Sequence, residues 1–149
     1  MNWYYKFIIA SMSAGIMLGV AAYTFIYAEG YSYLTNNPAA CSNCHVMNDY
    51  YNGWMKSSHK LVATCNDCHT PDGMISKYLT KAENGFWHSY AFTTGRFNEP
   101  IRIKKQNEDV VEQACRRCHK AIISAMDTDY HKNDWRVSCV RCHSTVGHQ

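Results

Sequence analysis

Cys41-Ser-Asn-Cys44-His45 is the first of four copies of one pattern, in which two cysteines stand three positions apart and a histidine follows at once. The other copies are Cys65-Asn-Asp-Cys68-His69, Cys115-Arg-Arg-Cys118-His119 and Cys139-Val-Arg-Cys142-His143, and the four copies use all 8 cysteines of the chain. C-x-x-C-H is the attachment motif of c-type haem, in which two thioethers hold the porphyrin and the histidine can coordinate its iron. The sequence therefore predicts four covalently bound haem c groups.

Two other uses of paired cysteines explain the pattern less well. Zinc sites and redox-active thiol pairs both contain C-x-x-C. Neither use, nor a set of structural disulfides, accounts for a histidine after every pair.

The composition of the remaining chain agrees with a haem-filled interior. Only 18 of the 120 residues from 30 to 149 are Val, Ile, Leu or Phe, too few for an ordinary core. The net charge of +3 in 149 residues is too small for a disordered polyelectrolyte and does not suggest a nucleic-acid binder. We expect a mostly α-helical fold with little regular strand, packed around the porphyrins and unable to fold without them. Helices are expected within residues 73–92 and 107–123, with a linker at 96–105.

The N-terminal region predicts a membrane anchor. Residues 7–28 carry no charge, and as a helix they reach roughly 33 Å, enough to cross a bilayer. Lys6 precedes them and Glu29 follows, so the positive-inside rule puts residues 1–6 in the cytoplasm and 29–149 outside, in the periplasm. A cleaved signal peptide is the alternative, although its apolar region would be unusually long. Gly15 and Gly19 form a GxxxG motif that could support a helix–helix contact.

The spacing of the motifs indicates an internal duplication. Both Cys41 to Cys65 and Cys115 to Cys139 span 24 positions, which predicts two di-haem modules at about 36–95 and 106–149. The four histidines outside the motifs provide one further imidazole for each iron: His59, His88, His131 and His148. A pseudo-twofold scheme assigns His88 to the first haem, His131 to the second, His148 to the third and His59 to the fourth.

Several segments together resemble a known family over essentially the whole chain. They include Cys41-Ser-Asn-Cys44-His45-Val-Met47, Ser58-His59, Cys65-Asn-Asp-Cys68-His69-Thr-Pro71, Trp87-His88-Ser89 and the closing His143 and His148. The chain resembles the NapC/NirT-type membrane tetrahaem quinol dehydrogenases, and within them the small subunits of cytochrome c nitrite reductase. The resemblance implies an inner-membrane protein that oxidises quinol, most simply menaquinol. It would pass electrons to the large catalytic subunit, where nitrite is reduced to ammonia, and would not reduce nitrite itself.

The resemblance also implies roles for individual residues. Met47 is similar to a methionine that replaces the motif histidine, here His45, as a ligand of the first haem. Lys81 and His88 are the candidates for the quinol site, where a proton acceptor is needed. His88 also stands where the family has a carboxylate beside the first haem. Two other functions remain open: the same role for a different periplasmic enzyme, or a self-contained multihaem reductase.

Overall fold

A long N-terminal helix leads into a small helical domain in the computed structural model, which describes residues 2–126 and 138–148. Helix α1, Trp3–Tyr27, is solvent-exposed along its whole length and has the length and hydropathy of a membrane span. Glu29 then takes a left-handed conformation (φ 52°), and the chain turns into the short 3-10 helix η1, Gly30–Leu34.

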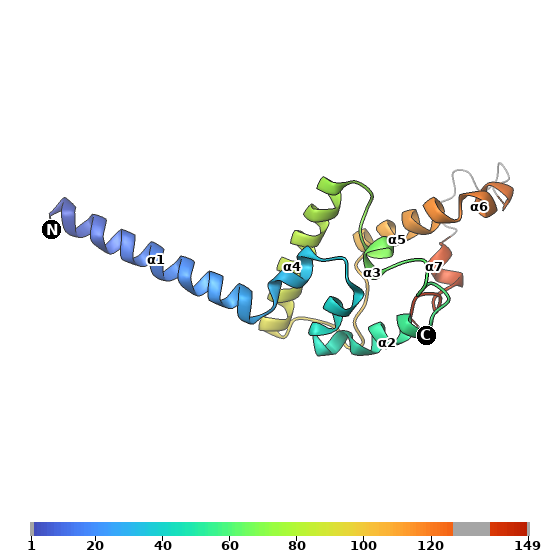
Figure 1. Ribbon diagram of the computed structural model, residues 1–149, viewed down its shortest axis with the longest axis horizontal. Helices are drawn as coiled ribbons and strands as arrows, with labels where there is room; N and C mark the ends of the chain where they lie inside the picture. Colours follow the sequence, from blue (N-terminus) through green and yellow to red (C-terminus); the bar gives the residue numbers. More distant parts are fainter. Residues whose placement is uncertain (1, 127–137, 149) are drawn as a thin grey trace.

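The domain after α1 contains only helices and connecting segments in the residues described (Figure 1). They follow in the order η2 (Pro38–Asn43), η3 (His45–Met47), α2 (Asn48–Lys56), α3 (Cys65–His69), α4 (Met74–Thr94), α5 (Lys105–Cys118), α6 (Lys120–Met126) and α7 (Cys139–Cys142). Helix α3 packs against α5, α5 against α7, and α4 against η1. The expected mostly helical class is confirmed.

Helix α4 is the longest element of the domain, and local signals fix both of its ends. Gly73 precedes it at φ 91°, and Gly95 follows it at φ 66°. Positive φ is easily reached only by glycine, and a left-handed residue after the last turn is a common way to end a helix. The helix expected within residues 73–92 is therefore present and continuous.

The helix expected over residues 107–123 is divided in two. Helix α5 ends at Cys118 and α6 begins at Lys120, because His119 leaves the helical conformation (φ −98°, ψ 24°). This break places the third motif at the end of a helix rather than in the middle of one.

Apolar side chains contribute almost nothing to an interior. Among the described residues, Ala114 is the only buried hydrophobic residue, and no large side chain is fully buried. Backbone and polar side chains hold the elements together instead. Trp54 Nε1, for example, donates to the Ala63 carbonyl oxygen at 3.0 Å. The scarcity of Val, Ile, Leu and Phe thus corresponds to a domain without an aliphatic core.

Candidate haem centres

The attachment motifs share one local geometry. Three of them are single helical turns, at α3, the end of α5 and α7, while the first lies in η2 and η3. In a helix, residues i, i+3 and i+4 share one face. Cys65, Cys68 and His69 therefore present two thiols and an imidazole on the same side, the arrangement that two thioethers and an axial ligand require.

The four motifs lie beside one another in chain order. Cys41 and Cys65 share a side-chain hydrogen bond, which lowers the pKa of Cys41 to about 7 and raises that of Cys65. Cys68 lies close enough to Cys115 for their thiolates to interact, which contributes to the raised pKa of Cys115. The nearby Cys115 likewise contributes to the raised pKa of Cys139. The motifs therefore form a row that begins near α1 and ends at α7.

His148 faces the motif histidine of α3. The ring centroids of His69 and His148 are 6.0 Å apart, with an interplanar angle of 30°. Two imidazoles on opposite sides of one metal, with metal–nitrogen bonds of about 2 Å, place their centroids roughly 6 Å apart. Burial, followed by the charge of nearby His148, lowers the pKa of His69 to about 4, so His69 is neutral at pH 7.

The backbone fixes the tautomer of His148. Its Nδ1 lies 3.0 Å from the Tyr50 carbonyl oxygen, which can only accept a hydrogen bond. Nδ1 therefore carries the proton, and Nε2 keeps its lone pair. Metal-ligating histidines commonly donate their other ring nitrogen in this way.

A second imidazole pair joins His59 to the third motif. The ring centroids of His59 and His119 are 6.1 Å apart, with an interplanar angle of 72°. The structure thus brings His148 to the second motif and His59 to the third, whereas the pseudo-twofold scheme expected them at the third and the fourth. That scheme assumed a symmetric exchange between modules, whereas α3 packs against α5 and the C-terminal segment returns to α2. His131 lies outside the described residues.

The residues present fit four covalent haems. None of the eight cysteines is in a disulfide, so each motif keeps both thiols for thioether formation. The two imidazole pairs have the separation that one iron needs between them, and the surrounding domain has no aliphatic core. His143 follows α7 directly, so the fourth motif also offers two thiols and an imidazole.

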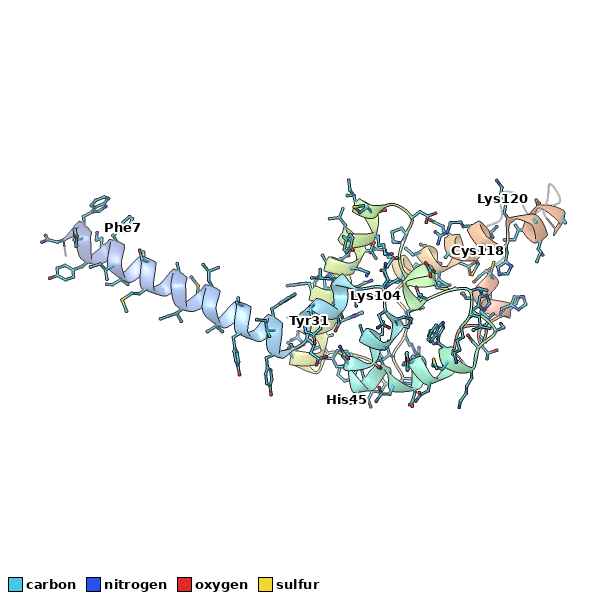
Figure 2. The ribbon with its side chains drawn as sticks, in the orientation of Figure 1. Phe7, Tyr31, His45, Lys104, Cys118 and Lys120 are labelled. Carbon is cyan, nitrogen blue, oxygen red and sulfur yellow. The ribbon has the colours of Figure 1, made fainter. Side chains whose placement is uncertain are left out.

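The first motif differs from the others at its histidine. His45 is exposed at the edge of the domain (Figure 2). Met47, two positions later, is half-buried. Both residues belong to η3, which packs against η2 and α2. Of the two candidate ligands in this segment, Met47 is thus the less exposed.

A tyrosine–histidine pair lies between the first motif and α4. Tyr33 Oη and His88 Nδ1 are 2.9 Å apart, and the Tyr33 ring packs against α4 at Gly85, where a Cβ would stand 3.4 Å from it. Burial raises the pKa of Tyr33 to about 12. Burial, followed by the charge of Lys104, lowers the pKa of His88. The sequence analysis identified His88 but not Tyr33.

Lys81 is buried and already hydrogen-bonded. It is 5% exposed, and its Nζ donates to the Thr35 carbonyl oxygen at 2.6 Å and to Asn36 Oδ1 at 3.1 Å. Asn66 Nδ2 donates to the same two oxygens, each at 3.2 Å. Burial and the charge of Lys77 lower the pKa of Lys81. Lys81 therefore connects α4 to the segment that leads into the first motif and to α3.

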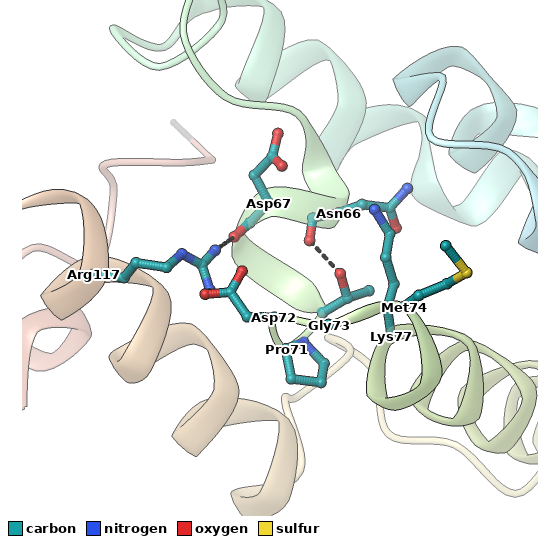
Figure 3. A pocket seen from close by; sticks show the side chains of 9 residues that line it. Asn66, Asp67, Pro71, Asp72, Gly73, Met74, Lys77 and Arg117 are labelled. Carbon is teal, nitrogen blue, oxygen red and sulfur yellow. Dashed lines mark hydrogen bonds and ion pairs between the residues drawn. The ribbon is translucent and has the colours of Figure 1, made fainter.

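An open polar cleft of about 230 Å³ lies where α3, the start of α4 and α5 meet (Figure 3). Arg117 crosses one side, donating to the Asp67 carbonyl oxygen at 3.0 Å and pairing with Asp72 at 3.0 Å. On the other side, Thr70 Oγ1 donates to the Asn66 carbonyl oxygen at 2.6 Å. The contacts across this cleft join the second motif to the third.

Glu112 joins the third motif to the fourth. It lies on α5 three residues before Cys115, and its carboxylate accepts hydrogen bonds from Ser138 Oγ and from the backbone nitrogens of Cys139 (2.9 Å) and Val140 (3.1 Å). Burial opposes its ionisation, but these bonds outweigh burial and lower its pKa. The sequence analysis missed Glu112. The only signal in the sequence was its position three residues before Cys115, which places both residues on one face of a helix.

Replacing Glu112 with alanine is expected to lower the free energy of unfolding by about 1–3 kcal/mol, because the N–H groups at the start of α7 lose their acceptor. Because the folded-state pKa lies below the ordinary 4.5, this stabilisation is present above pH 4.5 and is lost as the pH falls below it. Urea unfolding of the haem-loaded protein at pH 7 and pH 4 measures both effects. Asp109→Ala, which removes only an exposed ion pair with Lys105, is the control. Equal stability of the two variants at pH 7 would contradict this role.

The known proteins to which this chain is similar match it over nearly its full length. A sequence model described as the NapC/NirT cytochrome c family, N-terminal region, matches residues 2–149. The chain is 37% identical to the cytochrome c-type protein NrfH of Wolinella succinogenes over 142 residues, covering 89% of this chain and 80% of that protein. It is 30% identical to the cytochrome c nitrite reductase subunit NrfH of Nitratidesulfovibrio vulgaris, over 90% of this chain and 80% of that protein.

A solved structure shares the fold. A chain of the cytochrome c nitrite reductase NrfHA complex, bound to the HQNO inhibitor, superimposes with a TM-score of 0.64 at 27% identity. The match covers 91% of this chain and 88% of that chain.

Proposed function

Because the chain belongs to the NapC/NirT cytochrome c family, we propose that it is a membrane-anchored tetrahaem cytochrome that oxidises quinol and delivers the electrons to a periplasmic cytochrome c nitrite reductase. The observation that carries this proposal is the row of four attachment motifs, which starts beside the end of α1 and continues in chain order to α7. Such a row has one end at the lipid and the other in reach of a soluble partner.

The chain is a single-pass membrane protein, with α1 as its span. We place the segment before the span in the cytoplasm, because Lys6 precedes the span and Glu29 follows it. Residues 29–149 then lie in the periplasm, where c-type haem attachment takes place.

We assign the ligands from the observed pairs. When bound, four c-type haems supply one-electron chemistry and a conducting path through the domain. His69 and His148 hold the second iron, and His59 and His119 hold the third. His143 ligates the fourth, and His131 is the histidine left to complete it. At the first motif, the partial burial of Met47 and the exposure of His45 favour the methionine as ligand.

Replacing Met47 with leucine tests this ligand. Leucine has a similar volume but cannot bind iron, so the methionine-to-iron absorption is expected to disappear. The first-haem potential should fall, because thioether ligation holds it higher than imidazole ligation does. Optical spectra and a redox titration of the purified protein measure both. Met55→Leu, at another partly exposed methionine, should change neither. An unchanged spectrum in Met47→Leu would assign the ligand to His45.

The quinol site lies where α4 meets the first motif. Oxidation of a quinol releases protons as well as electrons, so an acceptor is required beside the hydroxyl. His88, with its pKa lowered and its Nδ1 held by Tyr33, is neutral at pH 7 and able to take a proton. Lys81 is two turns earlier on the same face of α4. Since its ammonium is bound to Thr35 and Asn36, it positions the segment that carries the first motif.

His88→Ala is expected to slow haem reduction by menaquinol by roughly 10²–10⁴-fold, the usual contribution of a general base. Tyr33→Phe, which removes the hydroxyl that orients His88, should cause a smaller decrease. Tyr31→Phe, at an exposed neighbour, is the control. Rates are measured by stopped-flow spectroscopy with menaquinol and with dithionite, and only the menaquinol rate should fall. A low-spin haem lost in His88→Ala would instead make His88 an iron ligand.

Reconstitution tests the whole proposal. The purified chain in proteoliposomes should be reduced by menaquinol, and nitrite should reoxidise it only after the large catalytic subunit is added. Rapid nitrite-driven reoxidation of the chain alone would make it a self-contained reductase and overturn the proposal. Failure of menaquinol to reduce the chain would also overturn it.

A further inference from the structure

Helix α4 exposes a continuous apolar stripe. The stripe consists of Ile75, Tyr78, Leu79, Phe86 and Tyr90, which are 78%, 43%, 65%, 64% and 41% exposed, and the exposed Ala82 lies between them. These positions recur at the three- and four-residue spacing of one helix face. From Ile75 to Tyr90 the stripe extends for roughly 22 Å at 1.5 Å per residue.

The opposite face of α4 is polar and faces the protein. Lys81 is buried against Thr35, Asn84 Oδ1 accepts a hydrogen bond from Asn107 at 3.1 Å, and His88 meets Tyr33. A helix on the surface of a water-soluble domain has the reverse arrangement, with its apolar side inward. Through Thr35 and Asn36 this polar face is joined to Asn66 of the second motif and to the segment that leads into the first, so the stripe lies on the side of α4 away from them.

The position of α4 relative to α1 identifies what covers the stripe. The span ends at Tyr27, and Tyr33 in η1 already contacts α4 at Gly85. The short segment from Tyr27 to Tyr33 therefore holds the middle of α4 close to the end of the membrane-spanning helix. Figure 1 shows α4 running across the direction of α1, on the side of the domain nearest to it. A helix in that position lies at the level of the lipid headgroups.

We propose that α4 is an interfacial helix that lies flat in the outer leaflet, with Ile75, Leu79 and Phe86 inserted between the acyl chains. Tyr78 and Tyr90 sit at the headgroup level, where tyrosine is enriched. Amphipathic helices bind the interface by burying such a face while the polar face stays outside. The occupant of the stripe is thus phospholipid, in continuity with the lipid around α1. This inference depends on α1 spanning the membrane and not on the quinol role.

The direct test uses the full chain with its catalytic partner in nanodiscs that contain a diazirine-labelled phospholipid. After illumination, mass spectrometry should find lipid adducts on residues 75–90 as well as on α1. Leu61 and Val62 are the matched control, because they are even more exposed (90% and 80%) but lie beyond α2, away from α1. Adducts confined to α1 would overturn the proposal. So would adducts on α4 that appear only without the catalytic partner, since protein would then cover the stripe.

A charged substitution provides a functional test. Leu79→Asp should slow haem reduction by membrane menaquinol severalfold and leave reduction by dithionite unchanged, while Leu61→Asp changes neither. Equal menaquinol rates in Leu79→Asp and the wild type would count against membrane insertion. If Leu79→Asp fails to fold, the adduct pattern of the wild-type chain still decides. A wild-type chain that shows adducts on α4 but is not reduced by menaquinol would refute the quinol role and leave this inference standing.

Discussion

Quinol-driven nitrite reduction by the membrane complex is expected to fall to background when Cys115 and Cys118 are both replaced by serine. The third motif lies between the second and the fourth, because α5, which ends in the third motif, packs against both α3 and α7. Without its two thiols no haem can be attached there, and the row is interrupted at its centre. Nitrite consumption with menaquinol as the electron donor is the measurement.

Two further measurements separate an interrupted row from a damaged partner. Nitrite reduction driven directly by reduced viologen should keep its wild-type rate, because it bypasses the membrane subunit. The intact mass of the variant chain should show three haems. A three-haem chain that still supports the wild-type menaquinol-driven rate would contradict a serial path.

Replacing His148 with alanine is expected to remove one low-spin haem from the spectrum of the complex. The rings of His148 and His69 lie 6.0 Å apart, the separation that one iron needs between two imidazoles, and His148 Nδ1 is held by the Tyr50 carbonyl oxygen. The variant leaves the second iron with one protein ligand and an open position. Electron paramagnetic resonance should then show a high-spin signal in place of one low-spin signal, and added imidazole should reverse the change.

A neighbouring substitution provides the control for His148. Ser144→Ala alters an exposed side chain of the same C-terminal segment and should leave all low-spin signals in place. An unchanged low-spin count in His148→Ala would refute the assigned pair. The double variant with His59→Ala should lose two low-spin signals, because the two histidines face different motifs.

Local chemistry made much of the protein predictable from sequence. A haem-attachment motif needs five consecutive residues, so the four sites follow from spacing alone. The uncharged segment of residues 7–28 is an equally local signal, which is why helix α1 was expected.

The features that could not be predicted depend on contacts between distant segments. His148 reaches Tyr50 across 98 positions, so its partner could not be inferred from an internal repeat. Glu112 bonds to the start of α7, although the segment 127–137, which lies outside the described residues, separates the two along the sequence. The apolar stripe of α4 was not recognised as such, because sequence alone does not show which face of a helix points outward. In an ordinary soluble domain, the apolar face would have been assigned to the interior.

The intact mass of the native chain, purified from membranes, tests the central claim most directly. The account predicts a single species that retains α1 and whose mass exceeds that of its polypeptide by four covalently attached haem groups. That mass would establish both the four thioether-linked porphyrins and the retained N-terminal helix. A mass equal to the unmodified polypeptide, or to a chain that lacks the first 28 residues, would contradict the account.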